Sequence, residues 1–312
     1  MKSVYVAELQ DGDDLNNEPF LIEDVVKRET KDGRPYLLCT FRDKTGQIGG
    51  VFWNVPEDVE SWVQQGIVSM VTGRVRSYRN SIQITTTDLN PQSDADMSLF
   101  LPTSNRSVDD MVDELKIIID ELDEPWKELV SALLLKPEML AILSKAPAAR
   151  MMHHAYIGGL LEHTLSMAQI GNMLAGQYSY VNKDLLLAGI LLHDMGKSLE
   201  YDTSGSFNFT DDGRLVGHVV RAAIMVEKAA AELGNISEEN LRELVHLILS
   251  HHGQLEWGAP VVPKTVEAVL LHQIDLLDSR MQGFIDHVQN DQGGGRWTSR
   301  QSYMFDTELR RP

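Results

Sequence analysis

The sequence lacks the features of a secreted, disulfide-stabilised or membrane-spanning protein. Its 312 residues include one cysteine, Cys39, so no disulfide can form within the chain and no cysteine-rich zinc site is available. No apolar run approaches the roughly 18 residues that a membrane span requires, and the N-terminal segment lacks the apolar core of a signal peptide. These absences predict a protein of the reducing cytoplasm without a membrane partner.

Basic residues are also scarce. The chain has 28 Lys and Arg against 46 Asp and Glu, which gives a formal net charge of −18 at pH 7. Proteins that bind polyanions normally neutralise phosphates with Lys and Arg, so this balance argues against a nucleic-acid substrate. Charge can be distributed unevenly, however, and two bound divalent cations would add about four positive charges that the count omits. Composition alone therefore leaves the substrate open.

The N-terminal third reads as a series of short strands. Turn signals such as Lys31-Asp32-Gly33 and Asp43-Lys44-Thr45-Gly46 separate runs of apolar and β-branched residues. The runs lie at 20–22, 36–41, 48–53, 68–71 and 83–87, with a small helix expected at 57–64. Five strands with one helix after the third is the order of an OB-fold. We therefore expect an all-β OB-fold barrel over residues 1–95.

The remainder of the chain reads as helical after a polar linker at 90–96. Ser107 and Asp110 have capping-box spacing, with Asp in place of the usual Glu. Helices are expected at 111–122, 126–133, 137–145, 158–175, 183–193, 218–233, 238–250 and 263–288, and a hairpin or loop at 202–213. The prediction is a multidomain protein in which an all-α domain, 96–292, follows the barrel. The tail, 293–312, carries no structural prediction.

Histidine and aspartate form a pattern along the helical part. Imidazole and carboxylate are preferred ligands of borderline and hard divalent metals, and seven ligands are too many for one tetrahedral site. Asp194 is the natural bridge between two ions, because a carboxylate has two oxygens. The members of the pattern are His163, the doublet His193-Asp194, His218, the doublet His251-His252, and Asp275.

Each of these residues also has a simpler interpretation. A single histidine on an apolar helix face is more often a hydrogen-bonded core residue than a metal ligand. The doublet His193-Asp194, however, directly follows the apolar run 185–192. Two ionisable groups at the end of a buried helix would be costly unless they were paired or bound to metal. As a set, the residues favour a metal centre.

The pattern resembles that of the HD domains, which have a His, a His-Asp doublet and an Asp, with extra His residues in binuclear members. The matching segments are LEHT at 161–164, HDMGK at 193–197, GH at 217–218, HHG at 251–253 and QID at 273–275. The resemblance implies a phosphohydrolase with two metal ions. One would be held by His163, His193, Asp194 and Asp275, and the other by Asp194, His218, His251 and His252. His246, His272 and His287 match no ligand position and are interpreted as structural.

Two metals can activate a water and clamp a phosphate, so no nucleophilic side chain is required. Asp194 and Lys197 are the predicted catalytic residues, because the Lys197 ammonium lies one helical turn on and can reach a bound phosphate. Its alternative is a solvated helix end. Arg221, three residues after His218, is a candidate substrate contact, and so are His153 and His154, which precede the first ligand helix. A loop or capping role is the alternative for His153 and His154.

The predicted barrel offers further candidates for substrate binding. OB-folds commonly bind single strands through aromatic platforms and a basic groove. Aromatics in a small barrel are usually core residues, however, and basic side chains on a strand are often only a solvated edge. The candidates are Arg74, Arg76, Tyr78 and Arg79 on the fourth strand and its turn, with Tyr36, Phe41 and Trp53 as platforms.

An OB-fold followed by a helical HD domain resembles the YhaM family of 3′-5′ exoribonucleases over nearly the whole chain. The specific segments are HHAYIGGLLEHT at 153–164 and HDMGK at 193–197. The resemblance implies trimming of single-stranded RNA, and of DNA in a wider specificity, from the 3′ end. It implies Mn²⁺ as the metal, although Fe²⁺, Co²⁺, Mg²⁺ or Zn²⁺ also suit such ligands. The sequence leaves the oligomeric state open, and a homo-oligomer is one of the alternatives.

Two other functions remain as alternatives. An HD-type phosphodiesterase for cyclic dinucleotides or other small nucleotides shares the binuclear pattern, but HHGQLEWGAP at 251–260 lacks the Gly-Tyr-Pro signature of the cyclic-dinucleotide subgroup. A non-catalytic nucleic-acid-binding regulator is the other alternative. The intact ligand set argues against it, because a domain freed from catalysis has no need for all seven positions.

Overall fold

A computed structural model describes residues 2–79, 81–149, 153–202, 207–291, 293–302 and 304–312. The chain divides into two compact units. One unit comprises Met1–Thr103 with Asp202–Asn208, and the other comprises Ser104–Tyr201 with Phe209–Pro312. None of the described helices has both the length and the apolar character that crossing a lipid bilayer requires.

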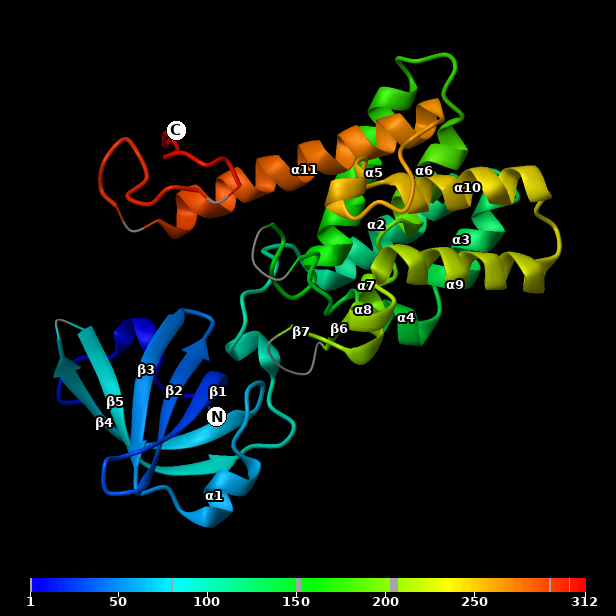
Figure 1. The fold of residues 1–312 in the computed structure, drawn as a ribbon. Coiled ribbons are helices and arrows are strands. Elements are labelled where there is room, and N and C mark those ends of the chain that lie inside the picture. Colours follow the sequence, from blue (N-terminus) through cyan, green and yellow to red (C-terminus); the bar gives the residue numbers. More distant parts are fainter. Residues whose placement is uncertain (1, 80, 150–152, 203–206, 292, 303) are drawn as a thin grey trace. The chain divides into compact units, whose positions relative to one another are not determined.

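The first unit is a closed barrel with the strand order β1-β2-β3-β5-β4 (Figure 1). Strands β3 and β5 pair in parallel, and the other pairs are antiparallel. A short helix, α1, follows β3, which confirms the predicted OB-fold order. The bounds are β1 Asp14–Glu29, β2 Pro35–Asp43, β3 Gly46–Trp53, α1 Glu57–Trp62, β4 Val68–Tyr78 and β5 Ser81–Pro91, with a 3-10 turn at Val6–Glu8 and another at Met97–Leu99.

Alternation along the strands fills the barrel. Phe41 has no exposed surface, and its ring centroid lies 6.3 Å from that of Phe20. Gly50 on the neighbouring strand has no Cβ for a steric reason: a Cβ there would lie 2.3 Å from the Phe41 ring. The pairing register of β1 shifts between Leu15 and Glu18 and again between Ile22 and Asp24. These irregularities bend β1, so that one long strand pairs with both β2 and β4 and closes the barrel.

The second unit is helical and is built around α6. Every residue of α6 from Leu185 to Leu192 is buried, and α3, α5, α10 and α11 pack against this helix (Figure 1). The helices are α2 Val108–Asp120, α3 Trp126–Leu134, α4 Pro137–Leu143, α5 Gly159–Ala175, α6 Lys183–Leu192, α7 Lys197–Glu200, α8 Asp211–Leu215, α9 His218–Leu233, α10 Glu238–Ser250 and α11 Val266–Asn290, with a 3-10 turn, η3, at Leu255–Trp257.

The segment predicted as a hairpin or loop contains two paired strands, β6, Tyr201–Asp202, and β7, Asn208–Phe209, and then a helical turn, α8, that was not expected; residues 203–206 lie outside the described part. A single turn such as α7 or α8 has too few residues to show a helical period, which is why the sequence pattern did not indicate either.

The C-terminal segment, residues 296–312, is folded onto the end of α11. Arg311 forms an ion pair with Asp291, and the Thr298 amide donates to the Leu309 carbonyl at 2.9 Å. The Phe305 ring packs edge-on against Phe284, with centroids 5.8 Å apart. The tail, which carried no structural prediction, is therefore part of the helical unit.

We expect Phe41→Ala to lower the free energy of unfolding by about 3 to 5 kcal/mol, because it leaves a cavity in the closed barrel. Trp53→Ala is the control: this residue is 49% exposed and stacks on Tyr36, so the loss should be about 1 kcal/mol. Urea unfolding followed by circular dichroism compares the two variants. Equal losses would contradict this division between a buried and a surface aromatic.

Candidate metal centre

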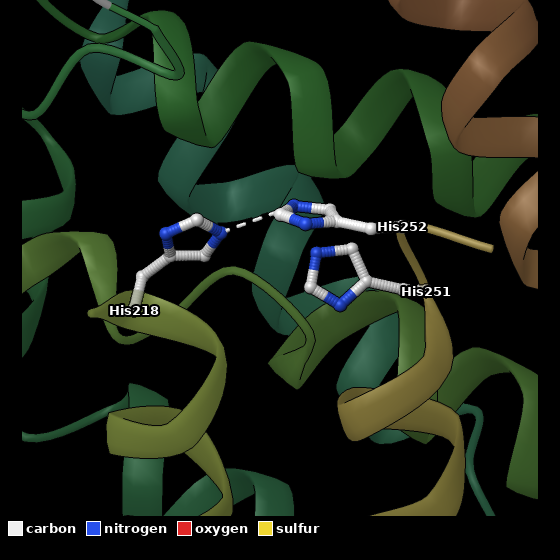
Figure 2. Close-up of side chains that lie close together, drawn as sticks. All are labelled: His218, His251 and His252. Carbon is white, nitrogen blue, oxygen red and sulfur yellow. Dashed lines mark hydrogen bonds between the residues drawn. The ribbon is translucent and has the colours of Figure 1, made fainter. Parts of the chain in front are cut away.

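Five of the seven predicted ligands lie at helix ends, which bring them together. His193 and Asp194 directly follow α6, and His251 and His252 directly follow α10. Where the chain leaves a helix, adjacent side chains can point in different directions. The two members of each doublet can therefore reach two separate metal positions. His218 begins α9, and Figure 2 shows its ring facing those of His251 and His252. His163 on α5 and Asp275 on α11 complete the cluster.

Asp194 lies between two sets of imidazoles. Its Oδ2 is 3.3 Å from His193 Nε2 and 3.9 Å from His163 Nε2. Its Oδ1 is 3.5 Å from His218 Nε2 and 3.6 Å from His251 Nε2. Two atoms that each lie about 2.1 Å from one ion, at a tetrahedral angle, are about 3.4 Å apart. Each oxygen therefore has the spacing to its own pair of nitrogens that a shared cation needs.

The two remaining members lie at opposite sides of this arrangement. Asp275 Oδ1 is 3.4 Å from His163 Nε2. His252 Nε2 is 3.3 Å from His218 Nε2, the contact drawn as a dashed line in Figure 2. Groups of three potential ligands, such as His218 with His251 and His252, have donor atoms within 4.8 Å of one another. These groups could hold a metal ion.

Unpartnered polar atoms support the fit of a cation. His163 Nε2, His193 Nε2 and Asp194 Oδ1 are buried without a hydrogen-bond partner among the described residues. A buried polar atom left in this state costs about 1 to 3 kcal/mol. All three atoms point into the cluster, so a cation there would satisfy them together. Nitrogen and oxygen donors of this kind suit first-row divalent metals.

Backbone carbonyls fix two of the rings. His193 Nδ1 donates to the Ile190 carbonyl at 2.8 Å, and His251 Nδ1 donates to the Ile248 carbonyl at 2.7 Å. A carbonyl oxygen can only accept, so the proton of each neutral ring is on Nδ1. The lone pair is then on Nε2, which faces Asp194.

Carboxylates that the sequence did not reveal fix two further rings. Glu200 Oε1 lies 3.0 Å from His218 Nδ1, and Asp278 Oδ2 lies 2.7 Å from His163 Nδ1. Such carboxylates orient a metal-binding imidazole and raise its basicity. Asp278 lies one helical turn after Asp275 on α11, so a carboxylate lies near each nitrogen of the His163 ring: Asp278 Oδ2 is hydrogen-bonded to Nδ1, and Asp275 Oδ1 lies 3.4 Å from Nε2. This i, i+3 spacing was the available signal for Asp278, although it is too common on helix surfaces to stand out.

The structure pairs two of the substrate candidates with carboxylates. His154 is buried behind His163: its Nε2 lies 3.0 Å from Asp278 Oδ2, and its Nδ1 lies 2.7 Å from the Tyr156 hydroxyl. Arg221 forms an ion pair with Asp212 of α8. Lys197, by contrast, begins α7 with its Nζ 2.5 Å from Asp194 Oδ2.

The electrostatics of the cluster favour a bound cation. Burial lowers the pKa of His163, but Asp275 and Asp278 more than offset this and raise that pKa to about 9. Burial raises the pKa of Asp194, but Lys197 and His193 outweigh it and hold that pKa well below its ordinary value. The carboxylates thus stay ionised and create a negative potential that a proton or a metal ion can neutralise.

A cavity of about 510 Å³ adjoins the cluster. The predicted residues in its wall are Asp194, Lys197, His251, His252 and Asp275. His153, which the sequence offers with His154 as a candidate substrate contact, also lies in this wall. Sequence reasoning missed the others or interpreted them as structural: Trp257, His272, Leu276, Ser279, Arg280 and Met304.

Comparisons with known proteins cover both units. Residues 160–280 match the HD domain family, and residues 20–91 match the OB-fold nucleic acid binding domain. A 3′-5′ exoribonuclease YhaM from Geobacillus sp. (strain WCH70) is 36% identical over 284 residues, which is 90% of this chain and 86% of that protein. A 3′-5′ exoribonuclease YhaM from Bacillus subtilis (strain 168) is 34% identical over 284 residues, covering 90% and 89% of the two chains.

Asp278→Ala should weaken Mn²⁺ binding by about 10- to 100-fold, because His163 loses the carboxylate that orients it. Asp278→Asn should lie between this variant and the wild type, since an amide oxygen can still accept from Nδ1. Calorimetric titration of the metal-free protein measures the affinity directly. Asp113→Ala, at an exposed carboxylate of α2, is the control. An Asp278→Ala titration that matches the control would exclude this positioning role.

Proposed function

Because the chain belongs to the YhaM family of 3′-5′ exoribonucleases, we propose that it is a metal-dependent enzyme that removes nucleotides from the 3′ end of single-stranded RNA. The observation that carries the proposal is the position of Asp194, with one oxygen facing each of two imidazole pairs beside a cavity. A cytoplasmic location is part of the proposal. The single cysteine, Cys39, supports it, because it is buried and can form no disulfide within the chain.

Two divalent ions are part of the proposal. Bound there, they would supply Lewis-acid activation of the phosphate and of the attacking water. Mn²⁺ is the proposed metal, and Fe²⁺, Co²⁺ or Zn²⁺ suits the same donors. One ion would be held by His163, His193, Asp194 and Asp275, and the other by Asp194, His218, His251 and His252.

Lys197 would stabilise charge on the phosphate. Its ammonium lies in the cavity wall and donates to Asp194 Oδ2, so it is already next to the position of a bound phosphate. A charge-assisted hydrogen bond to a phosphoryl oxygen strengthens as negative charge develops there. The fixed rings of His193 and His251 would hold their donor atoms in place through turnover, because their carbonyl bonds leave no freedom to rotate.

The barrel would hold the strand. Trp53 and Tyr36 form a cross-strand pair on the outer face of β2 and β3, stacked with centroids 4.7 Å apart. Arg74, Arg76 and Tyr78 alternate along β4 and are exposed, so they share the outer face of that strand. The Arg79 guanidinium lies 5.2 Å from the centre of the Tyr78 ring. Stacking and phosphate contacts do not read the sugar, so we propose that single-stranded DNA binds as well.

Asp194→Ala should abolish degradation of end-labelled single-stranded RNA, because the residue shared by both imidazole sets is lost. Lys197→Ala should lower kcat by about 10²-fold, as other single electrostatic donors do. The assay includes Mn²⁺ or EDTA and, as a second substrate, a cyclic dinucleotide, with Asp113→Ala as the control. RNA degradation by Asp194→Ala at the wild-type rate would refute the mechanism, and wild-type cleavage of the cyclic dinucleotide alone would favour a small-nucleotide phosphodiesterase.

Arg76→Ala should raise the KM for long RNA and reduce the slope of log affinity against log salt by about 0.7, the value for one lost phosphate contact on a single strand. Trp53→Ala should raise KM while the salt slope stays unchanged, because stacking releases no counterions. Arg242→Ala, an exposed arginine of α10, is the matched control. If the Arg76 and Arg242 variants behave alike, the barrel does not supply the strand affinity.

A further inference from the structure

The cavity beside the metal cluster extends well past the ligands. It shares Asp194, His251 and Asp275 with the cluster and continues to Trp257, Leu276, Arg280 and Met304, which no metal requires. Its volume of about 510 Å³ lies within the range of roughly 300 to 1,000 Å³ typical of small-molecule sites. Space of this size next to a hydrolytic centre suggests a place for one unit of the substrate.

Trp257 presents a large aromatic surface to this cavity. It ends η3 and is 51% exposed, although its indole would gain from burial. The loop that carries it is held close to the ligand doublet, since the Gly253 amide donates to the Ser250 carbonyl at 2.8 Å. A Cβ at Gly253, where φ is +78°, would lie 2.2 Å from the His272 ring. These contacts fix the start of the loop that carries Trp257, directly after the His251-His252 doublet.

Arg280 supplies a free cation in the same wall. Among the residues that the structure describes, no carboxylate lies within ion-pair distance of its guanidinium, in a chain of formal net charge −18. Its one described side-chain partner is the Phe305 ring, 5.8 Å from the guanidinium carbon. Guanidinium groups bind phosphate oxygens in a paired geometry, so this side chain is available to an anion in the cavity.

The C-terminal segment completes this wall. It brings Met304 into the lining, and Phe305 packs between Arg280 and Phe284. The segment is fastened to α11 by the ion pair of Arg311 with Asp291. Met304 thus adds an apolar group to a wall that also contains Trp257 and Leu276. Such groups suit the base or sugar of a nucleotide, while Arg280 suits its phosphate.

We propose that this cavity is the subsite for the 3′-terminal nucleotide of the strand, with Trp257 as the stacking platform for its base and Arg280 as a cation for its phosphate. The inference rests on the proposed exoribonuclease function. Stacking is available to every base, because each has a π face. The subsite would therefore accept any terminal base, and the enzyme would shorten strands without regard to sequence.

A double-mutant cycle with a modified substrate tests the stacking contact. Wild type and Trp257→Ala are compared on RNA with a normal 3′-terminal nucleotide and on RNA whose 3′-terminal ribose lacks a base. Removing either the indole or the base should lower kcat/KM by about 10- to 100-fold. Removing both should cost little more than removing one. Trp257→Phe should retain most activity.

The controls separate this inference from the proposed function. Trp297→Ala removes another exposed tryptophan, 55% exposed, that lies in the C-terminal segment but not in the cavity wall. For Trp297→Ala, the ratio of kcat/KM between the normal and the abasic RNA should equal that of the wild type. If Trp257→Ala also prefers the normal 3′ end over the abasic end as strongly as the wild type, the stacking subsite is wrong while the exoribonuclease function stands. If the wild type leaves unmodified RNA intact, the function itself fails and the subsite fails with it.

Discussion

Asp194 carries a negative charge to the end of α6, a helix whose residues from Leu185 to Leu192 are all buried. An ionised carboxylate in such surroundings is unfavourable unless positive charge and hydrogen-bond donors compensate it. The remainder of the helical unit supplies that compensation. Helix α5 and the ends of α9 and α10 bring imidazoles to its two oxygens, and α7 begins with the ammonium that bonds it. The requirement to stabilise one buried charge thus explains why so many helices begin or end at the same point.

The acidic composition of the chain does not by itself oppose a polyanionic substrate. Several of the acidic groups lie inside, where they hold imidazoles in place, as Asp278 holds His163 and Glu200 holds His218. A count of charged residues assigns such groups to the surface, where they would repel a polyanion. In the structure they raise the affinity of the cluster for cations instead. Net charge is therefore a poor guide to the substrate of a metal-dependent enzyme.

Residue type and spacing were enough to predict the OB-fold order and the residues that converge on Asp194. Strand alternation and helix ends are local signals, and His-Asp doublets after apolar runs are rare. Asp278 and Trp257 were missed for a physical reason. Their roles come from what lies opposite them in space: a ring from α5 for the first, a cavity wall from α11 and the C-terminal segment for the second. A carboxylate on a helix or a tryptophan in a loop carries no such information by itself.

The bend in β1 has a consequence for behaviour at high local concentration. Because β1 pairs with both β2 and β4, every strand of the barrel has a hydrogen-bonded neighbour on each side. A sheet with an open edge offers unpaired amides and carbonyls to a neighbouring chain and invites aggregation. Closure removes that edge, so copies of this chain at high concentration have no open strand, among the described residues of the barrel, through which to join.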